Sequence, residues 1–486
     1  MSSSSSDRVA LPVLLAFGVV LVLAVHYGSM LHVGTISHWD EYFTLERSHG
    51  FSLHSDWFTV YTNHRPSFVK PPLHYWLTAA ALAQFDDLEF ALRFWPFLLG
   101  LALLGATGLL AHALAPGHPY AIPAAILILA ASSLLWRHST SALLDTGAAF
   151  FLTLAIAAFI LAMRQPRWWY VVALAAGLGA LQKVPAAMVA VAVFLVLVPL
   201  SARFHDVSLR LIVRNVHFRI SLLLGTAVFL WWPILQTVLH GPRFIRSAYG
   251  RELVGRFAPS GGLADVEMQW WQWILRDGAG LWIPAIAALF LLPFLVRRPE
   301  AFLLPLAAVG FALMLTLASG MTYERYMLLV LPILAASLGV AMARMIPWQG
   351  LVVPAALLLA FWAGAPLQSA ESLRLTNDSQ SQYRPLLEDF ARALRDDETP
   401  VYCGWSRRLG VVPGAYSYHA SNGRSFTRLG TPDDLVVRTR QRGAAGPLYR
   451  GLCDAAELDD LRPYLEELEV IAELNGLLHW RGRIVR

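Results

Sequence analysis

Residues 94–136 read FWPFLLGLALLGATGLLAHALAPGHPYAIPAAILILAASSLLW and contain no Asp, Glu, Lys or Arg. About 20 apolar residues are enough for one helix to cross a bilayer, so this stretch is long enough for two. Pro116, Gly117 and Pro119 mark the break between them, because Gly and Pro interrupt helices. The stretch therefore predicts two consecutive membrane-spanning helices.

Similar uncharged runs recur along the chain as far as residue 370, and with 94–136 counted twice they predict eleven spans. Of the 486 residues, 56% are hydrophobic and only 15% are charged, whereas a soluble chain has about 25% charged residues. We therefore expect an α-helical polytopic membrane protein. The other runs are 9–39, 146–163, 168–182, 184–202, 220–242, 278–296, 301–323, 327–343 and 345–370.

The distribution of Arg predicts the orientation. If the N-terminus is cytoplasmic, the short cytoplasmic loops hold Arg pairs such as Arg164 and Arg167 with few acids, as the positive-inside rule requires. The opposite loops, 40–93 and 243–277, mix both signs and would be external. We predict a transmembrane domain over 1–370 and an external segment over 371–486. The first run is long and has no cleavage site, so we expect it to stay in the mature protein.

Residues 371–486 have a different composition, with many acids and alternating element types. Strand-like pieces at 400–405 and 477–480 alternate with helix-like pieces at 383–395 and 455–468, which predicts a small soluble α/β domain. Both cysteines, Cys403 and Cys453, lie there. An external location permits a disulfide, and two buried thiols are the alternative.

Several charged residues flank the predicted spans on the external side. Ionisable groups at membrane depth are costly, so such positions are candidates for a functional site. No basic tract is interleaved with aromatic residues, so no nucleic-acid partner is expected. The external candidates are Asp40, Glu41, Lys70, Asp145, Lys183, Arg256 and Arg325.

The two lysines support this interpretation. The chain contains 36 Arg but only two Lys, which are Lys70 and Lys183. The ammonium of Lys is a compact charge that the larger, planar guanidinium of Arg does not replace. The alternative is that the two lysines are placed there by chance and that their side chains reach the membrane interface.

The residue types on this side fit one kind of chemistry. Cations neutralise the charge on a departing phosphate, and a carboxylate can deprotonate an attacking hydroxyl. Asp40 is the best candidate base, with a structural ion pair as its alternative. For Asp145 the alternative is compensation of the helix N-terminus.

In these residues the chain resembles the GT-C integral-membrane glycosyltransferases, in the branch of lipid A aminoarabinose transferases and protein O-mannosyltransferase-like enzymes. The resemblance runs in order from residue 10 to about 345. Members often have thirteen helices, so it implies about 11–13 spans. The matching marks are Asp40-Glu41, Lys70-Pro71-Pro72-Leu73, Tyr75-Trp76, Arg93, Leu144-Asp145-Thr146, Gly177-Leu178-Gly179, Lys183-x-Pro185, Glu252…Arg256-Phe257 and Arg325-Tyr326.

The resemblance implies transfer of a sugar from a polyprenyl-phosphate donor to an acceptor hydroxyl on the periplasmic face of a bacterial inner membrane. The acceptor class, whether lipid, glycan or protein, stays open. The implied roles are catalytic for Asp40, Glu41 and Asp145; donor phosphate binding for Lys70, Arg256, Lys183 and Arg93; and substrate binding for Tyr75, Arg325 and Tyr326.

Two departures bear on a metal cofactor. Some members hold a divalent metal between a Glu and a His, and the corresponding positions here are Val69 and Leu253. Neither side chain can ligate a metal, so we expect no cofactor, with a divalent metal as the alternative.

Two alternative functions remain. One is a transporter or flippase of lipid-linked sugars, which would show discontinuous helices and ionisable residues deep in the membrane. The other is a non-catalytic relative.

Overall fold

The chain folds into two compact units. The first unit consists of Met1–Leu31, Ser67–Leu77 and Arg93–Ser372, and the second of His32–Pro66, Thr78–Leu92 and Leu373–Arg486. The predicted domain boundary at 370/371 lies outside the described residues and stays a prediction. The computed structural model describes residues 5–183, 192–193, 195–196, 209–251, 272, 280–297, 299–317, 324–362, 381–403, 412–424, 426–434 and 448–484.

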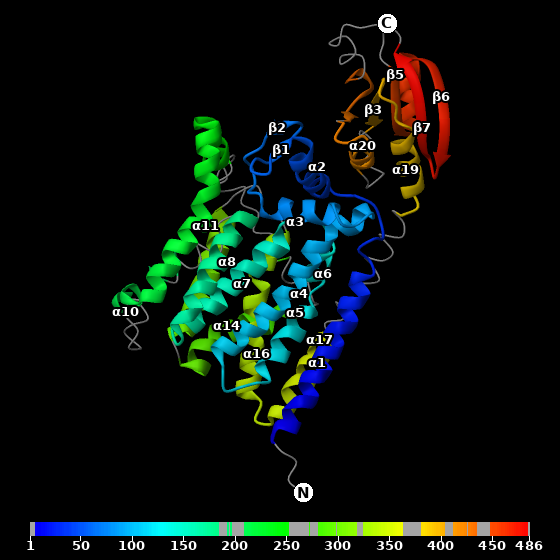
Figure 1. Cartoon of the computed structure of the whole chain (residues 1–486). Helices are drawn as coiled ribbons and strands as arrows, with labels where there is room; N and C mark the ends of the chain where they lie inside the picture. The colour runs from blue at the N-terminus through cyan, green and yellow to red at the C-terminus, as the bar shows by residue number, and fades with distance from the viewer. Residues whose placement is uncertain are drawn as a thin grey trace. The chain divides into compact units, whose positions relative to one another are not determined.

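Helices dominate the first unit (Figure 1). The predicted break at Pro116–Pro119 is confirmed, because α4 ends at Leu114 and α5 begins at Ala121. The short run 168–182 is also helical, as α8. Most of the uncharged runs have a counterpart. Among the described residues, the helices that lie wholly or, for α3 and α4, partly in this unit are α1 (Ser5–Gly28), α3 (Leu73–Leu82), α4 (Leu88–Leu114), α5 (Ala121–Ala130), α6 (Ser133–Ser139), α7 (Asp145–Ala162), η1 (Pro166–Trp168), α8 (Trp169–Gln182), α10 (Leu209–Arg214), α11 (Val216–His240), α12 (Pro242–Ile245), η2 (Arg246–Arg251), α14 (Trp282–Val296), α15 (Pro299–Leu317), η5 (Glu324–Leu329), α16 (Leu331–Met345), η6 (Gln349–Leu351) and α17 (Val352–Trp362).

Among the described residues, α4, α7 and α11 are each long and apolar enough to cross a membrane. The pair α5 and α6 would add a fourth span if its bent course is one crossing. Five shorter apolar helices accompany them, at 13–28, 282–296, 301–311, 331–345 and 349–362. The total of eleven spans stays a prediction, because several of the expected runs extend beyond the described residues.

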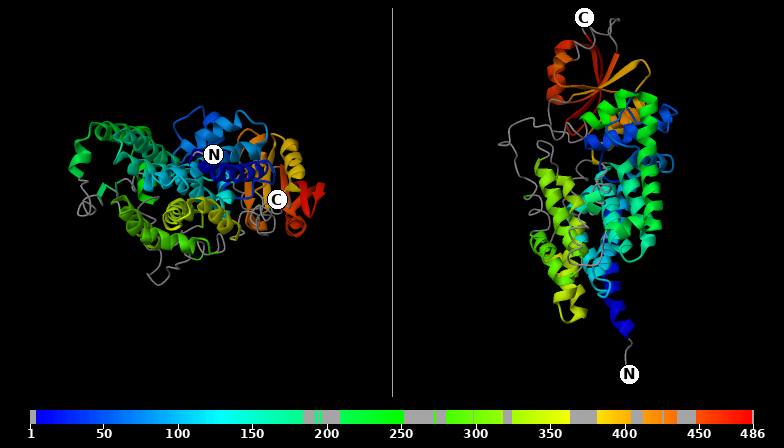
Figure 2. Two further views of the ribbon diagram at one scale, coloured as in Figure 1. Left: turned by 90° about the horizontal axis from the view of Figure 1, so that it is seen from below. Right: turned by 90° about the vertical axis from the view of Figure 1, so that its left-hand side faces the viewer.

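Close helix packing places α7 inside the first unit. Its apolar window is 89% buried, whereas that of α11 is 17% buried. α7 packs against α8, and α8 in turn packs against α11 (Figure 2). On another side, α16 crosses α5 at Gly339, where an added Cβ would lie 2.7 Å from the backbone nitrogen of Ala125. Helix α7 therefore carries its first residue, Asp145, in a protein environment, and α11 presents apolar side chains outward.

The segment predicted as the external loop 40–93 has regular structure. It contains α2 (Trp39–Leu53) and a short antiparallel hairpin of β1 (Tyr61–Thr62) and β2 (Arg65–Pro66), and it continues through α3 into α4. Helix α2 contains several charged residues, so it does not appear as an uncharged run in the sequence. Its buried side chains include Tyr42, Leu45 and Phe51.

The rest of the second unit contains a five-stranded sheet of order β4-β3-β5-β7-β6. β3 pairs in parallel with β4 and β5, while β7 pairs antiparallel with β5 and β6. The predicted α/β class is confirmed. The elements are α19 (Arg384–Ala393), β3 (Glu398–Cys403), α20 (Gly414–Ala420), β4 (Thr427–Leu429), β5 (Leu448–Asp454), α22 (Ala455–Leu461), η7 (Arg462–Tyr464), β6 (Leu465–Leu474) and β7 (Leu477–Ile484).

One predicted helix in this domain was too long. The helix-like piece 455–468 is helical only to Leu461, and the edge strand β6 begins at Leu465. Pro463 explains the stop, since proline cannot continue a helix. The strand escaped prediction because its exposed face is rich in Glu, which is typical of helices. The two alternatives for the cysteines are also resolved: Cys403 on β3 and Cys453 on β5 form a disulfide.

Candidate active site

Three charged side chains from separate segments of the first unit, those of Asp145, Lys183 and Arg325, form a buried cluster. The ammonium of Lys183, directly after α8, donates a hydrogen bond to Oδ1 of Asp145. The Nε atom of Arg325, in η5, lies 3.6 Å from Oδ2 of the same carboxylate. All three are largely buried, with side chains 7–15% exposed. Two cations share one anion, so the cluster carries a formal charge of +1.

The ends of α7 and α8 are held together next to this cluster. The amide of Gln182 donates to the carbonyl of Leu144 over 3.3 Å. Its side chain lies against Gly147, where an added Cβ would come within 2.3 Å of Nε2. A larger residue at position 147 would therefore displace the Gln182 amide. Asp145 also lies in the first turn of α7, so it compensates the helix N-terminus as well as pairing with Lys183.

Tyr326 and a second ion pair extend the cluster. The ammonium of Lys183 lies 4.8 Å from the ring centroid of Tyr326, within the range of a cation–π contact. The neighbouring Glu324 accepts a hydrogen bond of 3.0 Å from Arg137 at the end of α6. The structure thus brings together four residues with predicted site roles, which are Asp145, Lys183, Arg325 and Tyr326.

His138 was not predicted as a site residue. Both ring nitrogens are buried and have no hydrogen-bond partner in the part of the chain that the structure describes. The hydroxyl of Thr146 donates to its backbone carbonyl over 3.1 Å, which ties it to α7. A buried polar group normally has a hydrogen-bond partner, so the His138 ring is a position to test for contact with a ligand. In the sequence, the position of His138 beside Arg137, at the end of an uncharged run, could have identified it as a candidate site residue.

A sharp bend places Arg137 and His138. Helices α5 and α6 meet at 70° across a short break. Ser132 caps α6 by accepting a hydrogen bond of 3.2 Å from the backbone of Leu135, a common way to start a new helix after a break. The bend turns the chain so that α6 leads toward η5.

Three other residues with predicted binding roles, Arg93, Lys70 and Tyr75, lie in the first unit. Arg93 is 5% exposed and donates to the carbonyl of Leu31 over 3.3 Å. Lys70 is half-buried, and Tyr75 is fully buried. Their substrate roles stay predictions. Arg256 and Leu253 lie outside the described residues, so phosphate binding by Arg256 and the expected absence of a metal are also still predictions.

The Asp40-Glu41 pair lies in the second unit, at the start of α2. His38 caps this helix, with Nδ1 accepting a hydrogen bond of 3.1 Å from the backbone of Asp40. The Asp40 side chain is 36% exposed, whereas Glu41 is 3% exposed. An acceptor hydroxyl could therefore reach Asp40 more easily than Glu41. The catalytic roles of both residues stay predictions.

Comparisons with known proteins agree with this architecture. A model of the family described as dolichyl-phosphate-mannose-protein mannosyltransferase matches residues 69–232. None of the curated proteins matches the chain by sequence. Among solved structures, ArnT from Cupriavidus metallidurans bound to undecaprenyl phosphate is similar, with a TM-score of 0.75, 18% identity and 98% of each chain covered.

Two further structures share the fold. The apo state of the same ArnT gives a TM-score of 0.71 at 17% identity, covering 96% of this chain and 97% of that one. An oligosaccharyltransferase from Archaeoglobus fulgidus gives 0.53 at 13% identity, covering 95% of this chain and 72% of that one. The likeness includes the multi-pass helical part and the C-terminal sheet. The chain therefore has the fold of the GT-C integral-membrane glycosyltransferases, the group that its sequence resembles.

Proposed function

We propose that this protein transfers a sugar from a polyprenyl-phosphate donor to an acceptor hydroxyl on the periplasmic face of the inner membrane. The observation that carries the proposal is the Asp145–Lys183–Arg325 cluster. A carboxylate buried with two cations orients them while leaving a net positive charge, which suits an anionic phosphate. The neighbour bound to undecaprenyl phosphate, at a TM-score of 0.75, supports a donor of that chemical class.

The proposed reaction is a single displacement. Asp40 takes the proton of the acceptor hydroxyl, and the hydroxyl oxygen forms a new bond to the anomeric carbon of the sugar. The bond from that carbon to the phosphate oxygen breaks, and its electron pair leaves with the polyprenyl phosphate. Lys183 and Arg325, with Lys70 and Arg256, stabilise the negative charge that develops on this oxygen. The products are the glycosylated acceptor and polyprenyl phosphate.

A transporter or flippase of lipid-linked sugars is the second candidate. The bent pair α5 and α6 favours it, since broken helices are a feature of many transporters. The bend has another role here, because it leads to Arg137, which pairs with Glu324 next to the cluster. A non-catalytic relative, with the C-terminal domain as a binding module, is the third candidate.

Release of polyprenyl phosphate separates these candidates. Purified full-length protein in lipid nanodiscs is given short-chain polyprenyl-phosphate sugars and an extract of envelope acceptors. The proposal predicts that free polyprenyl phosphate and glycosylated acceptor form at the same rate. Movement of intact donor across the bilayer without release would support a flippase.

A second experiment would identify the sugar and the acceptor. The surface glycans and glycoproteins of a deletion strain are compared with those of the wild type by mass spectrometry.

A further inference from the structure

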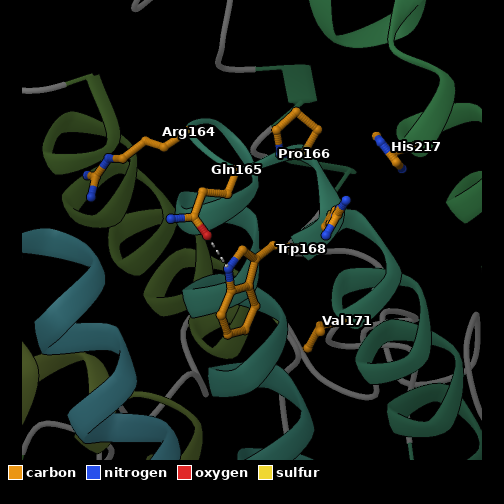
Figure 3. A pocket seen from close by; sticks show the side chains of 7 residues that line it. Arg164, Gln165, Pro166, Trp168, Val171 and His217 are labelled. Atoms are coloured by element: carbon orange, nitrogen blue, oxygen red, sulfur yellow. Dashed lines mark hydrogen bonds between the residues drawn. The ribbon is translucent and has the colours of Figure 1, made fainter.

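A pocket separate from the candidate active site lies where α7 turns into α8, beside the start of α11. Its volume is about 510 Å³ (Figure 3). None of its lining residues belongs to the cluster around Asp145. The pocket is lined by Arg164, Gln165, Pro166, Arg167, Trp168, Val171 and His217.

Aromatic packing fixes the turn that forms this pocket. Trp169 is 3% exposed and packs edge-to-face against Phe159 of α7, with ring centroids 5.3 Å apart, and against Phe218 of α11, at 4.9 Å. Pro166 starts the short helix η1 just before it. Because Trp169 anchors the turn inward, Arg164 and Arg167 stay exposed on its outer side.

Hydrogen bonds fix the polar wall of the pocket. The indole N–H of Trp168 donates to the side-chain oxygen of Gln165 over 3.3 Å. Across the pocket, Nδ1 of His217 lies 3.0 Å from the hydroxyl of Tyr170, and Asn215 caps α11 by accepting from the backbone of His217. Figure 3 shows Gln165 and Trp168 joined in this way, with His217 on the other side. The site is therefore largely formed before any ligand arrives.

The length of α7 places this pocket at the opposite membrane surface from Asp145. α7 has 18 residues, which span about 27 Å at 1.5 Å per residue. The hydrocarbon core of a bilayer is about 30 Å thick. Asp145 lies at one end of α7 and Arg164 just past the other. A Trp such as Trp168 is typical of the interface between lipid and water.

Exposed apolar side chains continue from the pocket toward the membrane interior. On α8, Leu174 lies one turn beyond Val171, and on α11, Ile220 and Leu224 follow His217. All three are exposed, at 54%, 41% and 49%. A ligand with a charged head and apolar tails would contact both surfaces at once.

We propose that this pocket binds the phosphate headgroup of an anionic phospholipid. The guanidinium groups of Arg164 and Arg167 supply a formal charge of +2, and no carboxylate is among the described residues that line the pocket. Arginine binds phosphate oxygens in a forked geometry, and Trp168 and His217 enclose the remainder of the headgroup. The acyl chains lie along Leu174, Ile220 and Leu224. Free inorganic phosphate shares the headgroup chemistry but cannot use these apolar contacts.

Lipid retention by the purified, delipidated full-length protein tests the proposal. The probes are phosphatidylglycerol, phosphatidylcholine and inorganic phosphate, each titrated in detergent and counted by native mass spectrometry. We expect phosphatidylglycerol to bind more tightly than phosphatidylcholine, with an affinity that falls as salt rises. R164Q/R167Q should weaken phosphatidylglycerol binding roughly tenfold, because the charge-assisted hydrogen bonds are lost. R344Q, at another exposed arginine, should leave it unchanged.

Three outcomes would overturn the assignment. The first is equal, salt-independent retention of the two lipids by the wild-type protein. The second is unchanged phosphatidylglycerol affinity in a folded R164Q/R167Q variant. The third is inorganic phosphate binding as tightly as phosphatidylglycerol, which would make the ligand a free anion. If the R164Q/R167Q variant aggregates, the lipid preference of the wild-type protein and the salt dependence of its binding still test the proposal.

Discussion

The ammonium of Lys183 donates a hydrogen bond to the carboxylate of Asp145, 38 residues earlier in the chain. The two side chains are 10% and 7% exposed. A buried ion pair stabilises a fold less than its geometry suggests, because both charges lose their hydration. Its position at the junction of α7, α8 and η5 is better explained by a site that needs an oriented positive charge.

Removing Lys183 alone should destabilise the protein. In K183M the Asp145 carboxylate keeps Arg325 as its one ion-pair partner among the described residues, with Nε 3.6 Å away. Losing one partner of a buried pair costs about 3–5 kcal/mol, and we expect about 3 kcal/mol since Arg325 remains. The double variant D145N/K183M should recover much of that stability but not the transfer activity. Thermal unfolding in detergent, with a transfer assay, checks both; full recovery of activity would assign the pair a purely structural role.

The Arg137–Glu324 pair provides a matched control. Its hydrogen bond is 3.0 Å long, but the side chains are 49% and 35% exposed. Exposed ion pairs contribute only about 0–1 kcal/mol. R137Q should therefore change the unfolding temperature far less than K183M does. Equal losses in the two variants would mean that burial of the Lys183 pair has no special effect.

Lysine at 183 should not be replaceable by arginine. K183R keeps the charge, but a planar guanidinium is larger than an ammonium, and the ring centroid of Tyr326 lies 4.8 Å from Nζ. We expect kcat/KM for the lipid-linked donor to fall about tenfold or more, with a smaller change in unfolding temperature. Unchanged kinetics would favour chance placement of this lysine over selection for an ammonium.

Acid should destabilise the C-terminal domain through His479. Burial, helped by the charge of Arg450, lowers the pKa of His479 from 6.5 to about 4, although Glu398 and Asp389 oppose the shift. Nη1 of Arg450 donates to Nε2 of His479 over 3.0 Å, so the folded state holds the neutral ring. Between these two pKa values the unfolded state binds more protons, and stability therefore falls as the pH falls from 6.5 toward 4.

The H479Q variant isolates this effect, because glutamine can still accept from Arg450 but does not titrate. Unfolding is compared between about pH 7.5 and about pH 5, above the range where Glu398 protonates. Burial opposes ionisation of Glu398, but hydrogen bonds and charge from Arg450 outweigh it and lower its pKa below the ordinary 4.5. Wild type should lose stability over this interval, and H479Q should lose less. An equal loss in both would exclude His479 as the sensor.

The disulfide between Cys403 and Cys453 should stabilise the C-terminal domain. It closes a loop of 50 residues, which in the chain-entropy model contributes about 4 kcal/mol. The double variant C403S/C453S should unfold at a lower temperature than wild type under oxidising conditions. A reducing agent should lower the wild-type transition and leave the variant unchanged. A wild-type transition that reductant does not affect would contradict this contribution.

The sequence predicted the apolar helices best, because hydropathy depends on local composition alone. The break between α4 and α5 and the start of α7 at Asp145 were both predicted. Helix α2 was missed because its charged residues, including the buried Glu41 and Glu46, resemble those of a loop. Strand β6 was missed because its exposed face is rich in Glu, which is typical of a helix. Their stability comes from contacts with distant segments, and sequence patterns do not contain those contacts.

For the candidate site, charge at the span ends identified Asp145, Lys183 and Arg325 but not their pairing. His138 was missed because a lone histidine is more often structural than functional. Only the fold shows that both its ring nitrogens are buried and lack a hydrogen-bond partner among the described residues. A variant such as H138Q would test whether these nitrogens contact a substrate.

The most direct test of the account is release of polyprenyl phosphate by D40N, compared with wild type and with D86N, which alters an exposed carboxylate in the same unit. A general base contributes about 10²–10⁴-fold. We therefore predict that D40N binds the lipid-linked donor normally but releases polyprenyl phosphate at least about 100-fold more slowly, while D86N matches wild type. Near-normal release and product formation by D40N would contradict the assignment of Asp40 as the catalytic base.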